Sequence, residues 1–88
     1  MTLKKKLTYL FIGTLLIGCS SSIQLQEYNS AIKAYKEGKY QTAITYIDRA
    51  IELNKDEYEF YILRAKANYK IGNKIYAMDD INKSIELV

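Results

Sequence analysis

The 88-residue sequence has no histidine, no proline and no tryptophan, and its only cysteine is Cys19. The absence of histidine removes the side chain most often used as a general base and as a metal ligand. A single cysteine leaves no partner for an intramolecular disulfide. The four glycines form no loop of the kind that cradles phosphates. These absences leave carboxylates as the remaining candidates for chemistry.

Two acidic pairs, Asp56–Glu57 and Asp79–Asp80, are those candidates. Adjacent residues on a helix do not face each other, so neither pair brings two carboxylates together. We interpret both pairs as residues of a solvated face or of a helix start. The sequence predicts no catalytic residue, no metal ligand and no cofactor, and therefore a protein that is not an enzyme.

Positive charge is concentrated at the N-terminus. The chain has 13 basic and 10 acidic residues, a formal charge of +3, and residues 4–6 are three consecutive lysines. Without residues 1–18, the ten remaining basic residues balance the ten acidic ones. Tyr35-Lys36 and Tyr69-Lys70 place aromatic and basic side chains together, a pattern that could stack on bases. A neutral chain, however, lacks the net positive electrostatic field that attracts nucleic acid. Nucleic acid is not an expected partner.

An apolar run from Leu7 to Ile17 follows the three lysines. A stable transmembrane helix needs about 20 apolar residues, so this run is too short to be one. A positive segment, a short apolar segment and then small residues are typical of a secretory signal. The run ends in Leu16-Ile17-Gly18-Cys19, followed by serines at 20–22, and this ending resembles the lipobox of bacterial lipoproteins.

The lipobox resemblance implies a signal peptide at residues 1–18, cleavage between Gly18 and Cys19, and acyl chains such as palmitate on Cys19. Residues 19–23 would then be the lipidated cysteine and a short serine-rich tether. The chain is expected to be lipid-anchored in the bacterial cell envelope, facing the periplasm or the surface, and in the outer membrane if the cell has two membranes. The alternative is a buried or free cysteine near an uncleaved anchor.

Four segments with helical apolar spacing follow the serines, and no segment alternates as a strand does. We predict helices over about Gln24–Glu37, Tyr40–Leu53, Asp56–Ile71 and Lys74–Leu87, so the fold class is all-α. Capping boxes are expected at Ser21 with Gln24 and at Asp56 with Glu59. In the first two helices the apolar stripes are Leu25, Tyr28, Ile32 and Tyr35, and then Tyr40, Ala43, Ile44, Ile47, Ala50 and Ile51. In the last two helices the residues expected on the buried side are Tyr58, Tyr61, Ile62, Ala65 and Tyr69, and then Ala77, Met78, Ile81 and Ile85.

The sequence repeats itself at an offset of 34 residues. Gly38 matches Gly72, Ala43 matches Ala77, and further identities include Tyr35 with Tyr69 and Ile47 with Ile81. A fixed period of this length indicates stacked helical units. The pattern resembles the tetratricopeptide repeat, a helix–turn–helix unit of 34 residues. The positions that carry the resemblance are Ala31, Gly38, Tyr40, Ala43, Ile47 and Ala50 in the first unit, and Tyr61, Ala65, Gly72, Ala77, Ile81 and Ser84 in the second.

The resemblance implies two tandem helix–turn–helix units of an α-solenoid, one over residues 24–56 and one over 57–88. The sequence departs from the family pattern in three ways. Lys55 stands where proline is usual, Glu27 and Ser30 occupy positions that normally pack on the second helix, and no polar helix covers the apolar face of the last helix before Val88.

In this family the first helix of each unit lines a concave groove. By position, this resemblance implies that the groove contains Leu25 together with eight residues expected to bind a partner. These eight are Tyr28, Ile32, Tyr35, Lys36, Ile62, Lys66, Tyr69 and Lys70. The alternative is that the aromatic and aliphatic members of the set are core residues. The family's clamp for a C-terminal carboxylate is not expected, because Tyr28 and Ile32 occupy its first-unit positions.

The sequence therefore favours a membrane-anchored envelope lipoprotein that acts as a protein–protein interaction adaptor, with another envelope protein or peptide as its partner. Two alternatives remain open. One is a self-assembling structural lipoprotein, a homo-oligomer formed through the uncovered C-terminal helix. The other is a truncated or accessory fragment of a larger envelope complex or enzyme subunit.

Overall fold

The computed structural model describes the backbone of residues 10–88 and the side chains of residues 22–88. The described chain forms four α-helices and no strand, so the predicted all-α class is confirmed. The helices are α2 at Leu10–Lys36, α3 at Tyr40–Leu53, α4 at Tyr58–Lys70 and α5 at Lys74–Leu87. The bounds of α3 and α5 agree with the predicted ranges, and α4 is shorter than predicted at each end.

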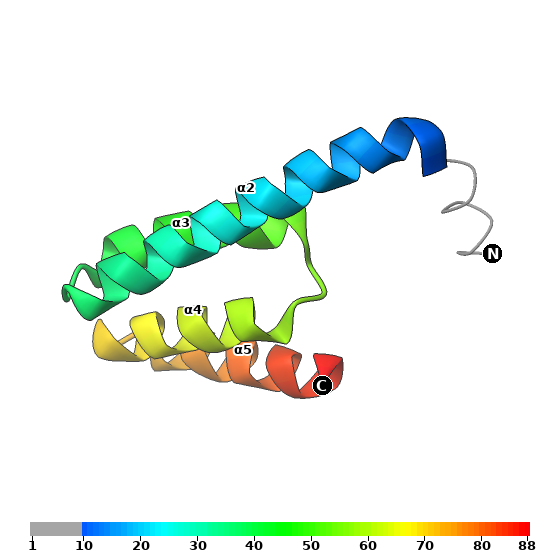
Figure 1. Cartoon of the computed structure of the whole chain (residues 1–88). Coiled ribbons are helices and arrows are strands. Elements are labelled where there is room, and N and C mark those ends of the chain that lie inside the picture. The colour runs from blue at the N-terminus through cyan, green and yellow to red at the C-terminus, as the bar shows by residue number, and fades with distance from the viewer. Residues whose placement is uncertain (1–9) are drawn as a thin grey trace.

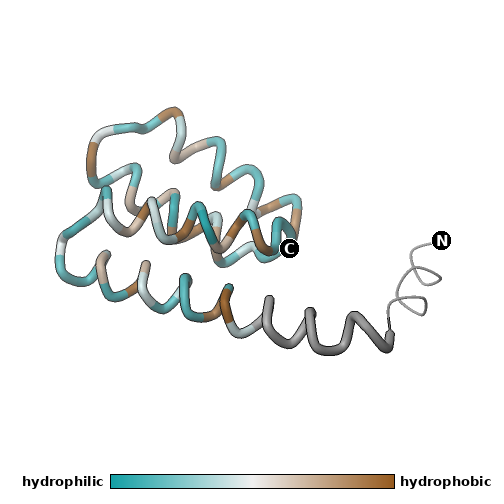
Figure 2. The backbone as a smooth tube through the Cα atoms, turned by 90° about the horizontal axis from the view of Figure 1, so that it is seen from above, coloured by the Kyte–Doolittle hydropathy of each residue, from teal (hydrophilic) through white to brown (hydrophobic). Residues whose placement is uncertain are grey.

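The helices form two hairpins, α2 with α3 and α4 with α5, stacked in two layers (Figure 1). Both hairpin turns lie at one end of the molecule, and the connection from α3 to α4 lies at the other. Helix α3 packs against α2 and also against α4, whereas α5 contacts only α4 among the described helices. Along the part of the chain that is coloured in Figure 2, each helix carries both hydrophobic and hydrophilic bands, as expected of helices that bury part of their surface.

Glycine ends the first helix of each hairpin. Gly38 has φ +79° and Gly72 has φ +90°, values that L-residues with a side chain rarely adopt. The amide of Lys39 donates to the carbonyl oxygen of Ala34 at 2.8 Å, and the amide of Asn73 donates to that of Asn68 at 2.8 Å. Both turns are therefore Schellman motifs, in which the glycine amide also donates to the carbonyl oxygen three residues earlier.

Small side chains bring the helices of the first hairpin together. Ala31, Ala43 and Ala50 are buried, and Ile47 is the largest fully buried side chain. Ala31, Ile47 and Ala50 form one cluster with Phe60 and Leu63 of α4. The core therefore joins the two hairpins through α3 and α4.

The start of α2 differs from the prediction. The helix begins at Leu10 and continues through Gln24, so the predicted helix start and the Ser21 capping box are wrong. Serine costs a helix only about 0.5 kcal/mol relative to alanine, so the three serines are not enough to end it. The predicted signal peptide at 1–18, the cleavage site at Gly18–Cys19 and the lipidation of Cys19 lie outside the residues whose side chains are described.

Helix α4 also starts differently, because Asp56 does not cap it. Glu57 is the N-terminal flanking residue and makes no side-chain capping hydrogen bond. The amide of Asp56 instead donates to the side-chain oxygen of Asn54 at 3.0 Å, and the hydroxyl of Tyr61 donates to the carbonyl of Lys55 at 2.9 Å. These bonds hold the connection between the hairpins.

The buried sides of α4 and α5 were predicted only in part. In α4, Tyr61 and Ala65 are buried as predicted, but Tyr58 and Tyr69 are exposed, Ile62 is half-buried, and Phe60 and Leu63 are buried instead. In α5, Ala77 is buried as predicted. Three predicted buried residues of α5 are exposed, because no described helix covers that side: Met78, Ile81 and Ile85.

Candidate partner-binding groove

Two adjoining hollows lie on one face of the stack. The first lies between α2 and α4 and has a volume of about 340 Å³. The second lies between α4 and α5 and has a volume of about 510 Å³. The hollows share Tyr35, Ile62 and Lys66, and together they form what we call the groove. All eight residues predicted to bind a partner line it: Tyr28, Ile32, Tyr35, Lys36, Ile62, Lys66, Tyr69 and Lys70.

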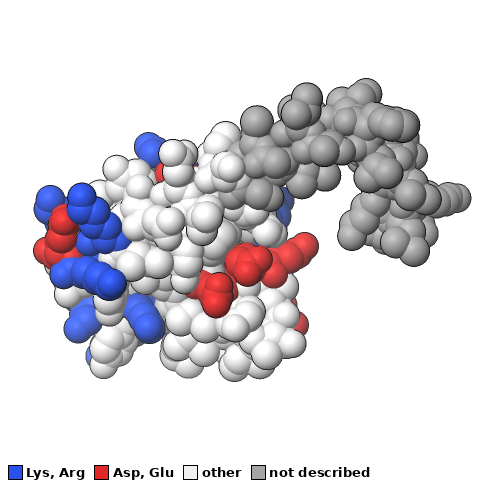
Figure 3. Space-filling model, viewed as in Figure 1, with Lys and Arg blue, Asp and Glu red and all other residues white. Residues whose placement is uncertain are grey.

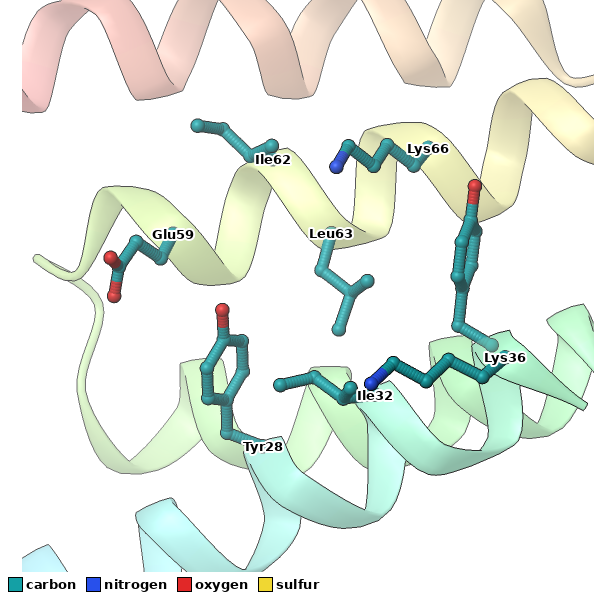
Figure 4. Close-up of a pocket in the computed structure, with 8 residues that line it drawn as sticks. Tyr28, Ile32, Lys36, Glu59, Ile62, Leu63 and Lys66 are labelled. Carbon is teal, nitrogen blue, oxygen red and sulfur yellow. The ribbon is translucent and has the colours of Figure 1, made fainter.

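Helical spacing explains why these residues share a face. In α2 the lining residues follow Tyr28 at intervals of four, seven and eight, and in α4 they follow Ile62 at the same intervals. Residues at such intervals lie on one side of a helix. The close-up shows the side chain of Tyr28 pointing from α2 towards α4, and that of Leu63 pointing from α4 towards α2 (Figure 4).

The α2 side of the groove is continuous with the core. Tyr28, Ile32 and Tyr35 are half-buried and pack against the core cluster. The ring of Tyr28 lies 5.0 Å from that of Phe60 between centroids, and the ring of Tyr35 lies 5.3 Å from that of Tyr40 at a steep angle. These contacts make the α2 wall of the groove a packed aromatic surface that is continuous with the core.

The α4 side of the groove is open. Tyr69 is 62% exposed, and Lys66 and Lys70 are also exposed. Leu25, which was also expected in the groove, is exposed and lies beside Tyr28 in a separate hollow with Glu57, Glu59 and Phe60. One wall of the groove is thus part of the core and the other is free surface.

Charge is separated along the groove. Lys36, Lys70 and Lys74 lie near the hairpin turns, where the space-filling view shows positive charge gathered (Figure 3). Glu57 and Glu59 lie at the opposite end, at the start of α4. Burial, and then the negative charges of Glu59 and Glu57, raise the pKa of the Tyr28 hydroxyl above its usual value, so Tyr28 is a neutral hydrogen-bonding group at neutral pH.

A polar cluster outside the groove joins three helices, and sequence reasoning missed it. Arg64 of α4 donates from Nε and Nη2 to the two carboxylate oxygens of Asp80 in α5, both at 2.9 Å, and from Nη1 to Asp48 in α3 at 2.8 Å. The hydrogen bonds that Arg64 donates to Asp80 are the largest cause of the raised pKa of the Arg64 guanidinium. Asp80 is buried, which corrects its interpretation as a solvated residue. The counterparts of Arg64 and Asp80 one period earlier are Ser30 and Tyr46, so the repeat carried no signal for this pair.

The described residues hold neither a metal-binding cluster nor a membrane-spanning helix. They contain no group of three or more histidine, cysteine, aspartate or glutamate residues placed to hold a metal ion. Within the same part of the chain, no helix has both the length and the apolar character needed to cross a membrane.

Comparison with known proteins agrees with the hairpin architecture. The heat shock protein STI1 of Saccharomyces cerevisiae, which contains tetratricopeptide repeats, is 33% identical to this chain over 58 residues. The match supports tetratricopeptide-like helical repeats. It covers 66% of this chain but only 10% of STI1, so the chain spans about a tenth of that relative's length. No protein-family model matches the chain.

Proposed function

We propose that this chain is a lipid-anchored protein of the bacterial cell envelope that binds a segment of another envelope protein in its groove, without catalysis. The observation that carries the binding proposal is the groove itself. Eight residues chosen from the sequence line two adjoining hollows on one face, with an ordered aromatic wall and an exposed one. Aromatic residues in such positions are enriched among those that contribute most to protein–protein affinity.

The anchoring part of the proposal is supported by the sequence of residues 4–22 and by its resemblance to the lipobox. It is tested by growing cells that express the full chain with a radiolabelled fatty acid. We expect label on the wild-type chain and none on Cys19→Ser, with Ser22→Ala as a labelled control. Equal labelling of the Cys19→Ser chain would contradict lipidation at Cys19.

The binding part of the proposal is best tested at Tyr69, because Tyr76 provides a matched control. Tyr69 is 62% exposed and lines the groove, whereas Tyr76 is 63% exposed and lies outside it. A photo-crosslinking amino acid placed at residue 69 of the full chain in its native envelope is expected to capture a partner, and the same group at residue 76 is not. In chains without the crosslinking group, Tyr69→Ala should weaken partner binding about tenfold or more, and Tyr76→Ala should leave it unchanged.

The same variants separate binding from folding. Both tyrosines are mostly exposed, so their replacement should leave the far-UV circular dichroism spectrum and the unfolding midpoint near those of the wild type. A folded Tyr69→Ala chain that still captures the partner at full strength would contradict the groove assignment.

A further inference from the structure

Helix α5 presents an apolar stripe that none of the described helices covers. Ile75, Met78, Ile81, Ile85 and Val88 recur at intervals of three and four residues and therefore lie on one side of the helix. Their exposed fractions are 76%, 63%, 47%, 67% and 85%. Helix α5 lies at the outer edge of the stack, with α4 on its inner side (Figure 1).

Helix α3 shows what the stripe is suited to contact. One period earlier, Met78, Ile81 and Ile85 correspond to Ile44, Ile47 and Ile51. Ile44 and Ile47 are buried and Ile51 is half-buried, because α3 packs against α4 as well as α2. A helix laid on α5 would bury its stripe in the same way.

The first helix of a second copy is a poor candidate for that helix. Helix α4 supplies Phe60, Leu63 and Ala67 to the interior, and all three are buried. The residues one period earlier in α2 are Gln26, Asn29 and Lys33, which are exposed. Placing two amides and an ammonium group on an apolar stripe would remove them from water without partners. Head-to-tail stacking of copies through α2 and α5 is therefore disfavoured.

Helix α5 itself is a better partner for a second α5. Ile75 and Asn82 are seven residues apart, and Met78 and Ile85 repeat the same interval three residues later. This is the a and d pattern of a coiled coil, in which an asparagine at an a position fixes register and favours a parallel pair. All four side chains are exposed, so the pattern is available for contact.

The charges beside the stripe favour the parallel orientation. Lys74 and Asp79 are exposed and occupy the flanking g and e positions, five residues apart. Between parallel helices, g of one copy meets e of the other, so Lys74 approaches Asp79 of the second copy. Between antiparallel helices, the e positions of one copy meet the e positions of the other. Asp79 would then approach Glu86, the next e position, of the second copy. The first arrangement is attractive and the second is repulsive.

We propose that the chain forms a two-fold symmetric dimer in which the α5 helices of two copies pack parallel, with Asn82 facing its symmetry mate. Five half-exposed or exposed aliphatic side chains amount to on the order of 500 Å² of apolar surface per copy. Two copies would bury roughly 1,000 Å², at the lower limit for a specific interface. The dimer is therefore weak and depends on concentration.

The test measures self-association of the full chain in mild detergent by sedimentation equilibrium, with Cys19→Ser in every variant to prevent disulfides at residue 19. We expect a monomer at low protein concentration and a dimer at high protein concentration. Ile85→Lys should raise the dissociation constant about tenfold or more, because it places a charge on the stripe. Leu25→Lys, an equally drastic change at an exposed site on α2, is the control and should leave it unchanged. Asn82→Ile should lower the constant about tenfold, because it removes the polar pair.

Disulfide cross-linking distinguishes the parallel pair from an antiparallel pair and from head-to-tail stacking. With Ile75→Cys alone, a parallel pair forms a disulfide-linked dimer under mild oxidation. An antiparallel pair requires Ile75→Cys together with Val88→Cys, and head-to-tail stacking requires Asn29→Cys together with Met78→Cys. A single copy at every concentration, an unchanged constant in Ile85→Lys, or linkage only in the paired variants would overturn the proposal.

Met78 and Ile81 also line the second hollow of the groove, so the dimer would cover the α5 side of that hollow. Lys36→Ala, at an exposed residue that lines only the first hollow, should leave the dimer unchanged. Absence of the dimer would not alter the crosslinking expected at residue 69, so the two proposals fail separately.

Discussion

Helices α3 and α5 hold the same place in the two hairpins, but their surroundings differ. Ile47 of α3 is fully buried, whereas Ile81, its counterpart in α5, is 47% exposed. The residue type and the helical position are the same, so the neighbours decide the burial. Helix α3 has a helix on two sides and α5 has one. The repeat therefore defines which face of a helix is apolar, and the stack defines whether that face is covered.

The two hairpins differ in the polar contact between their helices, which is short and partly buried in the second and long and more exposed in the first. The Arg64 cluster joins α3, α4 and α5 through two carboxylates. In the first hairpin, Glu27 of α2 approaches Arg49 of α3 at 3.8 Å, and the arginine is mostly exposed. An exposed pair of this kind contributes little to stability, so the first hairpin depends on its alanine and isoleucine contacts.

The largest expected effect on stability comes from replacing each of the matched isoleucines, Ile47 and Ile81, with alanine. Ile47→Ala should lower the free energy of unfolding by about 3 kcal/mol, because it leaves a cavity in the shared core. Ile81→Ala should lower it by about 0.5 kcal/mol or less in dilute solution, because the side chain is already half in water. Urea denaturation followed by circular dichroism measures both. Equal losses would mean that α5 is covered in solution by something outside its own hairpin.

The Arg64 cluster gives a smaller effect with a matched control in the adjacent residue. Asp80→Ala removes two charge-assisted hydrogen bonds and leaves Arg64 with Asp48 alone, and we expect a loss of about 2 kcal/mol. The loss stays below that of a fully buried pair because the Arg64 side chain is 26% exposed. Asp79→Ala should change stability by less than about 0.5 kcal/mol, since Asp79 is exposed. Urea denaturation of the two variants side by side tests the difference, and similar losses would show that the Arg64–Asp80 pair does not stabilise the second hairpin.

The sequence predicted the glycines that end the first helix of each hairpin and the residues that line the groove, but not the starts of α2 and α4 or the whole buried side of α4. The 34-residue period placed Gly38 and Gly72 at the helix ends, and the spacing that begins at Tyr28 and Ile62 selected residues on one face. Burial and polar contacts that depend on a neighbouring helix were not predictable in the same way. The exposure of Met78 depends on which helix lies beside α5, and the Arg64–Asp80 pair joins residues that the repeat does not relate.

The two glycine turns should respond alike, unlike the isoleucine pair. Gly38→Ala and Gly72→Ala each place a side chain at positive φ, which costs about 1 kcal/mol, and neither added Cβ would have an atom within 4 Å. The loss is therefore backbone strain alone, and the two values should agree within a few tenths of a kcal/mol. Gly38→Asn and Gly72→Asn are the controls and should recover part of it, because asparagine tolerates this conformation. Thermal unfolding of all four variants measures the effect. A much larger loss at one turn would show that the hairpins differ in their turns as well as in their surroundings.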